Sequence, residues 1–133
     1  MSADIDEELE RTTRLRGFRY GLHDFEAHLW GAEYLKKHND NTEANYLKMG
    51  LLDRKAKEMV IIVACIAQKD LVSHLQVHMH AANRAGASPE EILELIELVG
   101  GWIGNVAKII GLEAWRATFR PDIPTLDRVV ELR

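Results

Sequence analysis

Apolar side chains recur every three to four residues along most of this chain of 133 residues, which is the spacing of a helix with one buried face. No stretch alternates between apolar and polar residues as a half-buried strand does, and the Asn-Gly and Asp-Gly pairs typical of tight hairpins do not occur. The first proline in the chain is Pro89, so no earlier residue lacks the backbone donor that a helix needs. The sequence therefore predicts an all-α protein.

Start and stop signals divide the chain into successive helices. The first expected helix is strongly charged and is predicted to be peripheral, whereas the second carries an apolar stripe formed by Phe25, Leu29, Trp30 and Tyr34. The tryptophans and methionines fall on such apolar stripes and are predicted to lie in the core. The expected helices cover residues 5–15, 23–37, 42–49, 54–67, 70–85, 89–99, 102–119 and 125–132.

Two of these helices carry distinctive signals. The second half of helix 54–67 is apolar on every side, which predicts a helix buried all round, and a single small domain does not easily surround such a helix. We therefore expect other subunits to supply part of its cover. The helix after Gly86 begins with Ser88, Pro89 and Glu91, which form a capping box with proline at the first helical position. Gly100-Gly101 is expected to interrupt that helix.

Composition and charge narrow the class of protein. Hydrophobic residues make up 47% and charged residues 29% of the chain, which predicts one globular domain over residues 1–133. The formal net charge of -4 gives no basic excess with which to neutralise nucleic-acid phosphates. No apolar run reaches the roughly 20 residues of a membrane span, and no secretion signal is visible. A cytoplasmic protein without nucleic-acid or membrane partners is expected.

Three of the six histidines, His74, His78 and His80, fall within seven residues. Positions i and i+4 of a helix share a face, so His74 and His78 point the same way and His80 is turned away. Such a pair can transfer protons or chelate a transition metal, and it is also compatible with an ordinary amphipathic helix. Leu75 stands where His-Glu-x-x-His zinc enzymes carry their catalytic glutamate.

Two further residues are candidates for chemistry. Glu58 lies where helix 54–67 changes from charged to apolar, and a carboxylate carried into an apolar environment can serve as an acid or a base. The alternative is a solvated residue near the start of the helix, which the helix dipole favours. Cys65 is the single cysteine, and the sequence places no partner near it. We expect this thiol to behave as an inert small hydrophobic group.

The order of these features resembles the carboxymuconolactone decarboxylase superfamily, which includes the AhpD-like alkylhydroperoxidases. The segment from Leu51 to Val60 leads into an apolar helix, and the segment from His78 to Ile92 contains Ala85-Gly86-Ala87-Ser88-Pro89-Glu90-Glu91. The resemblance covers about residues 24–118 and is most specific from Asp53 to Ile92. It implies an AhpD-like helical bundle that forms a homo-oligomer, commonly a trimer or hexamer, with helices packed across subunits.

The resemblance also shows where this chain departs from the family's sites. The AhpD-like members that this chain resembles carry a relay of a glutamate, a Cys-x-x-Cys pair and a histidine. Glu58 and His78 correspond to the glutamate and the histidine, but Leu71 and His74 stand at the two cysteine positions. A dithiol peroxidase needs one thiolate to attack and a second to resolve, so that mechanism is not expected. The decarboxylase branch carries an acidic residue near the position of His74, and the chain departs there as well.

These residues lead to a functional hypothesis. The chain is predicted to be a carboxymuconolactone decarboxylase-like enzyme that applies acid–base chemistry to a small carboxylate or lactone. His78 would supply a proton, His74 would stabilise the developing oxyanion, and Glu58 would orient or recharge a histidine. No resident cofactor or metal ion is part of this prediction. Candidates to hold a substrate carboxylate are Arg54, Lys55 and Lys57.

Two alternatives remain open at the level of the sequence. In the first, the chain has lost the catalytic relay of the AhpD-like members, and it is a non-catalytic binding or assembly protein without dithiol peroxidase activity. In the second, His74 and His78 bind a metal ion, and Glu58 or a neighbouring subunit completes the site.

Overall fold

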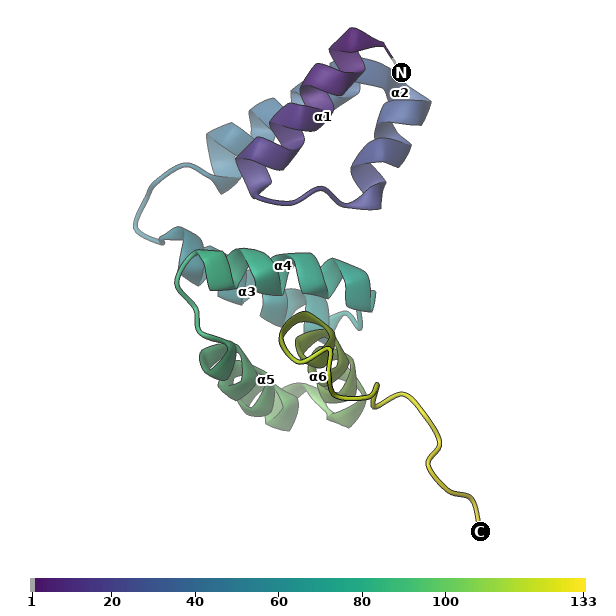
Figure 1. The fold of residues 1–133 in the computed structure, drawn as a ribbon. Coiled ribbons are helices and arrows are strands. Elements are labelled where there is room, and N and C mark those ends of the chain that lie inside the picture. The colour runs from purple at the N-terminus through teal and green to yellow at the C-terminus, as the bar shows by residue number, and fades with distance from the viewer. Residues whose placement is uncertain (1) are drawn as a thin grey trace. The chain divides into compact units, whose positions relative to one another are not determined.

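The computed structural model describes residues 2–133 and contains helices and no strands over that range, which confirms the all-α prediction (Figure 1). None of the helices in this described part is both long and apolar enough to cross a membrane. The α-helices are α1 (Ala3–Arg16), α2 (Gly21–Asn41), α3 (Arg54–Ala67), α4 (Val72–Arg84), α5 (Pro89–Ile103) and α6 (Asn105–Phe119), and a short π-helix, η1 (Thr42–Tyr46), follows α2.

The chain forms two compact units, Met1–Arg54 and Lys55–Arg133. In the first unit, α1 packs along α2, and Leu9, Ala27 and Leu35 form its buried apolar cluster. The expected peripheral helix is thus an integral part of this unit, because Leu9 is almost completely buried.

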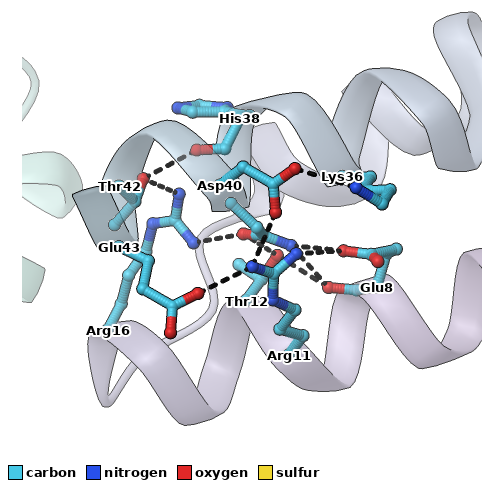
Figure 2. A network of polar contacts seen from close by, with 10 residues as sticks. Glu8, Arg11, Thr12, Arg16, Lys36, His38, Asp40, Thr42 and Glu43 are labelled. Atoms are coloured by element: carbon cyan, nitrogen blue, oxygen red, sulfur yellow. Dashed lines mark hydrogen bonds and ion pairs between the residues drawn. The ribbon is translucent and has the colours of Figure 1, made fainter. Parts of the chain in front are cut away.

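Buried polar contacts join α1 to α2 and η1, as Figure 2 shows. Arg16 donates to Asn39 Oδ1 and to Thr42 Oγ1, each over 2.7 Å. Thr12 donates to the same Asn39 oxygen over 3.1 Å. Burial lowers the pKa of Arg16 from its ordinary value. Because buried polar groups are costly unless they are paired, these contacts fix the register of α1 on its partners.

The apolar stripe predicted for the second helix is not its buried face. Trp30 is 56% exposed, and the other stripe residues Phe25, Leu29 and Tyr34 are exposed as well. The helix is kinked at Gly31, whose φ of 77° lies in the left-handed region, and the helical spacing does not continue through this residue. The buried positions of α2 are His23, Glu26, Ala27, Leu35 and Asn39.

The buried histidine of α2 makes the first unit sensitive to pH. The Tyr20 N–H donates to His23 Nδ1 over 3.1 Å. Burial, and then the nearby Arg16 and His38, lower the pKa of His23 to about 4. The folded-state pKa lies below the unfolded value near 6.5, so the unfolded chain takes up a proton first as the pH falls.

We therefore expect the free energy of unfolding to be unaffected by His23 above pH 6.5 and to fall by about 3 kcal/mol between pH 6.5 and 4. Urea denaturation followed by circular dichroism at several pH values measures this loss. His23→Asn keeps an acceptor near the Nδ1 position without a titrating group and should flatten that part of the profile. The exposed His28→Gln is the matched control. An unchanged profile in His23→Asn would contradict the prediction.

In the second unit, α6 packs against both α4 and α5, and α3 contributes to the same core (Figure 1). The buried members of this core come from all four helices and from the loop before α5. They are Ile62, Ile66, Leu75, Met79, Ala82, Ala87, Ile92, Ile96, Ala107 and Ala114.

The predicted capping box at the start of α5 is confirmed. Ser88 Oγ accepts from the Glu91 N–H, and Glu91 Oε1 accepts from the Ser88 N–H, each over 3.0 Å. The predicted interruption at Gly100-Gly101 is wrong, because α5 continues to Ile103 and ends at Gly104, whose φ is 118°. At Gly100 a Cβ atom would lie 2.9 Å from Lys108 Cδ, so this glycine allows α6 to approach closely.

One prediction about buried residues of this unit is wrong within the single chain, and another depends on cover that a single chain does not supply. Helix α3 buries Ile62 and Ile66 completely, but Val60 is 61% exposed, so the helix is not enclosed on every side. Trp102 is 87% exposed, whereas Trp115 packs on the core and donates to the Pro89 carbonyl over 2.8 Å. Apolar spacing shows which residues share a helix face but not which face is covered. Cover by another subunit stays a prediction.

The helix predicted over residues 125–132 is absent from this described segment. The tail is tied at its start to Glu113, which accepts from Thr125 Oγ1 and from the Leu126 N–H. Beyond that point Val129 and Leu132 are exposed, so a helix there would gain nothing from packing. A segment of this length is too short to be helical without tertiary contacts.

Candidate functional site

The three residues singled out in the sequence meet between α3 and α4. Glu58 of α3 is completely buried, and its Oε2 atom lies 2.9 Å from His78 Nδ1. His78 Nε2 lies 3.2 Å from His74 Nε2 one helical turn away, and the two rings meet edge to face. His80 is exposed on the same helix, as the spacing predicted.

A fourth group, Asp70, extends this arrangement. Its Oδ2 atom contacts His74 Nδ1, and its Oδ1 atom accepts from the Leu71 N–H over 2.8 Å. Burial on its own would raise the pKa of Asp70, but the hydrogen bonds from His74 and the Leu71 N–H lower it below its usual value. Asp70 is therefore a carboxylate at neutral pH.

The turn between α3 and α4 explains how Asp70 reaches this position. The Asp70 N–H bonds to the Cys65 carbonyl and the Lys69 N–H to the Ile66 carbonyl, each over 3.0 Å. This pair of bonds is a Schellman motif, which ends α3. The motif needs a left-handed residue, and Lys69 supplies it with a φ of 56°. The chain thus accepts backbone strain at a lysine in order to turn Asp70 back toward α3 and α4.

The same turn places Asp70 beside the single cysteine. The Cys65 thiol hydrogen-bonds the Asp70 carboxylate, and burial together with this bond raises the pKa of Cys65 to about 11. The expectation that Cys65 lacks a partner is therefore wrong, because the turn brings in a residue five positions later. The thiol is protonated at neutral pH and is not a ready nucleophile.

Proton counting shows what the four groups Glu58, His78, His74 and Asp70 can do. Two neutral imidazoles bring two N–H protons, and two carboxylates bring none. The three contacts that join these groups become three hydrogen bonds only when a third proton is present. The four groups share that proton, and a carboxyl group lies at each end of their chain of contacts. The arrangement can therefore hold a proton and give it away.

A pocket of about 470 Å³ lies at the Asp70 end of the chain of groups. His74 is one-third exposed and reaches this pocket, whereas His78 lies behind it with 12% of its side chain exposed. The pocket is lined by Cys65, Gln68, Lys69, Asp70, Leu71 and His74.

The predicted carboxylate-binding cations have contacts elsewhere. Lys55 pairs with Glu91 over 2.8 Å. Arg54 lies over the Tyr46 ring and donates to the Arg16 carbonyl. Lys69, which the sequence analysis did not select, is the cation that lines the pocket.

The sequence also contained a signal for Asp70. Asp70, His74 and His78 are spaced four residues apart, so all three lie along one side of the helix that begins here. In the sequence prediction Asp70 is only the first residue of the helix expected over 70–85. The link to Cys65 had no comparable signal, because it depends on the left-handed conformation of Lys69.

Over its described residues the chain thus combines an all-helical fold with a buried glutamate–histidine pair that leads toward a pocket. The chain matches the family model described as "Carboxymuconolactone decarboxylase family" over residues 32–117, roughly two-thirds of its length. The chain belongs to this family. All the site residues described above lie within the matched range. Comparison with curated proteins and comparison with solved structures each found no match.

Proposed function

We propose that this chain is a decarboxylase-like enzyme that applies histidine–glutamate acid–base chemistry to a small carboxylate or lactone. The observation that carries the proposal is the path from the buried Glu58 through His78 to His74 at the pocket, with contacts of 2.9 and 3.2 Å. Burying a carboxylate costs desolvation free energy even when it is paired with a histidine, so such a pair points to a functional role. Family membership supports this class of reaction.

The reaction needs a proton donor beside the carbon that loses carbon dioxide. When the bond to the carboxylate breaks, its electron pair passes to the adjacent carbon and is shared with a carbonyl oxygen as an enolate. His74 lies at the pocket and gives this carbon a proton, and the neutral imidazole then recovers one from solvent. Lys69 is placed to hold the substrate carboxylate or the developing oxyanion.

The roles of the two histidines differ from those proposed from the sequence. His74 reaches the pocket, so it takes the part of proton donor. We assign the Nδ1 proton of His78 to its contact with Glu58, so that His78 Nε2 accepts from His74 Nε2. In this assignment the two residues position the donor and stabilise its charged form. The partner implied is a small-molecule carboxylate or lactone.

Proton delivery can be followed directly in deuterated water. The chelator-treated protein is incubated with small lactones and 3-oxo acids that carry a carboxylate, including carboxymuconolactone, and the products are examined by NMR. We expect release of carbon dioxide and one deuterium at the carbon that lost it. Failure of every compound to lose carbon dioxide or to exchange a proton would contradict the proposal and favour a binding or assembly protein.

A further inference from the structure

A second set of side chains shares His74 with the proton path and faces the same pocket. Cys65, Asp70 and His74 each offer one ligand atom, a sulfur, a carboxylate oxygen and an imidazole nitrogen, and these atoms lie within 4.8 Å of one another. We propose that these three side chains bind a zinc ion, whose fourth ligand is a water molecule from the pocket. The inference does not depend on decarboxylation, since it concerns binding.

The three donor types suit zinc better than other common cations. Zinc accepts thiolate, imidazole and carboxylate together, whereas magnesium and calcium require mainly oxygen ligands. Tetrahedral zinc holds its ligand atoms about 3.3–3.7 Å apart, so ligand atoms within 4.8 Å of one another are already near the spacing that zinc requires. Three protein ligands with an adjoining pocket are typical of a zinc site that keeps one open position.

The backbone holds two of the ligands in place before any ion arrives. The Schellman motif at the end of α3 bonds the Asp70 N–H to the Cys65 carbonyl, so the two residues are fixed side by side. The Leu71 N–H occupies Asp70 Oδ1 and leaves Oδ2 directed at His74. Such preorganisation keeps the ligand atoms together without ordering a loop on binding.

The imidazole ligand also has the outer partners that zinc-bound histidines have. With the ion on His74 Nδ1, its Nε2 proton is donated to His78 Nε2, and the Nδ1 proton of His78 is donated to Glu58. Every contact in this path is then satisfied by the two protons of neutral imidazoles. The ion thus takes the place that the third proton occupies in the metal-free site, and the Cys65 thiol releases its own proton to solvent when its sulfur binds zinc.

The zinc ion and that proton therefore exclude each other at His74 Nδ1. In the zinc-bound protein the one proton of His74 lies on Nε2 and is donated to His78, so Nδ1 has none for a substrate at the pocket. Zinc is accordingly expected to inhibit the proposed decarboxylation.

Cobalt provides a direct test because it replaces zinc and gives an absorption band with thiolate ligands. Chelator-treated protein is titrated with Co²⁺ and separately with Zn²⁺ in a calorimeter. We expect one ion per chain and a near-ultraviolet thiolate-to-cobalt band, which can come only from Cys65 because the chain has one cysteine. Cys65→Ser should abolish the band and weaken zinc binding by more than the roughly 10–100-fold that loss of an outer partner costs.

Two further variants complete the test. Asp70→Asn should weaken zinc binding while the band persists at higher cobalt concentration, and it serves if Cys65→Ser does not fold. His80→Gln changes an exposed histidine on the same helix and should leave both readouts unchanged. Binding without a thiolate band would overturn the proposal in favour of a site on His74 and His78, and the absence of binding would overturn it outright.

Discussion

Replacing His74 with glutamine is expected to lower kcat by about 10²–10⁴-fold, the range that a positioned proton donor contributes. Glutamine keeps a polar side chain at the pocket but cannot deliver a proton at neutral pH. His74 is one-third exposed, so the free energy of unfolding should change little. Steady-state rates with the substrate identified by the deuterium experiment measure the loss.

The His78 variants separate positioning from proton donation. His78→Ala removes the acceptor that holds His74 Nε2, so we expect most of the turnover to be lost while the fold is retained. His80→Gln, on the exposed side of the same helix, should retain the wild-type kcat. Full activity in either His74→Gln or His78→Ala would contradict the proposed path of the proton.

Much of the second unit could be predicted because its signals are local. The sequence predicts that α3 begins at Arg54 and ends with the apolar run at Ala67, and the structure has the same bounds. The cap at Ser88 depends on residues three apart, which a sequence shows directly. The pairing of His74 with His78 is likewise a consequence of helical spacing.

The features that escaped prediction depend on backbone geometry or on which face is covered. Lys69 adopts a conformation that lysine rarely adopts, and only this turn brings Cys65 and Asp70 together. Gly31 breaks the helical phase inside α2, so the stripe that includes Trp30 does not mark its buried face. Neither departure is encoded in the apolar spacing, which assumes an unbroken helix.

The buried pair Glu58 and His78 is expected to be retained for chemistry at the expense of stability. Glu58→Ala leaves the His78 Nδ1 proton without its acceptor in an almost water-free place and opens a cavity at a fully buried position. The unsatisfied buried donor and the cavity together should lower the free energy of unfolding by about 2–5 kcal/mol. Urea denaturation at neutral pH measures the change.

The double variant Glu58→Leu, His78→Phe removes both polar partners at once and fills the space with apolar groups. Neither carboxylate nor imidazole then has to be desolvated, and His74 is exposed enough for water to replace its lost partner. We expect this variant to match the wild type in stability or to exceed it by about 1–4 kcal/mol, although it should be inactive. A double variant less stable than Glu58→Ala would show that the pair holds the fold together. A stable but inactive one would show that α3 and α4 would pack well without the pair, which leaves proton transfer as the reason for burying a carboxylate there.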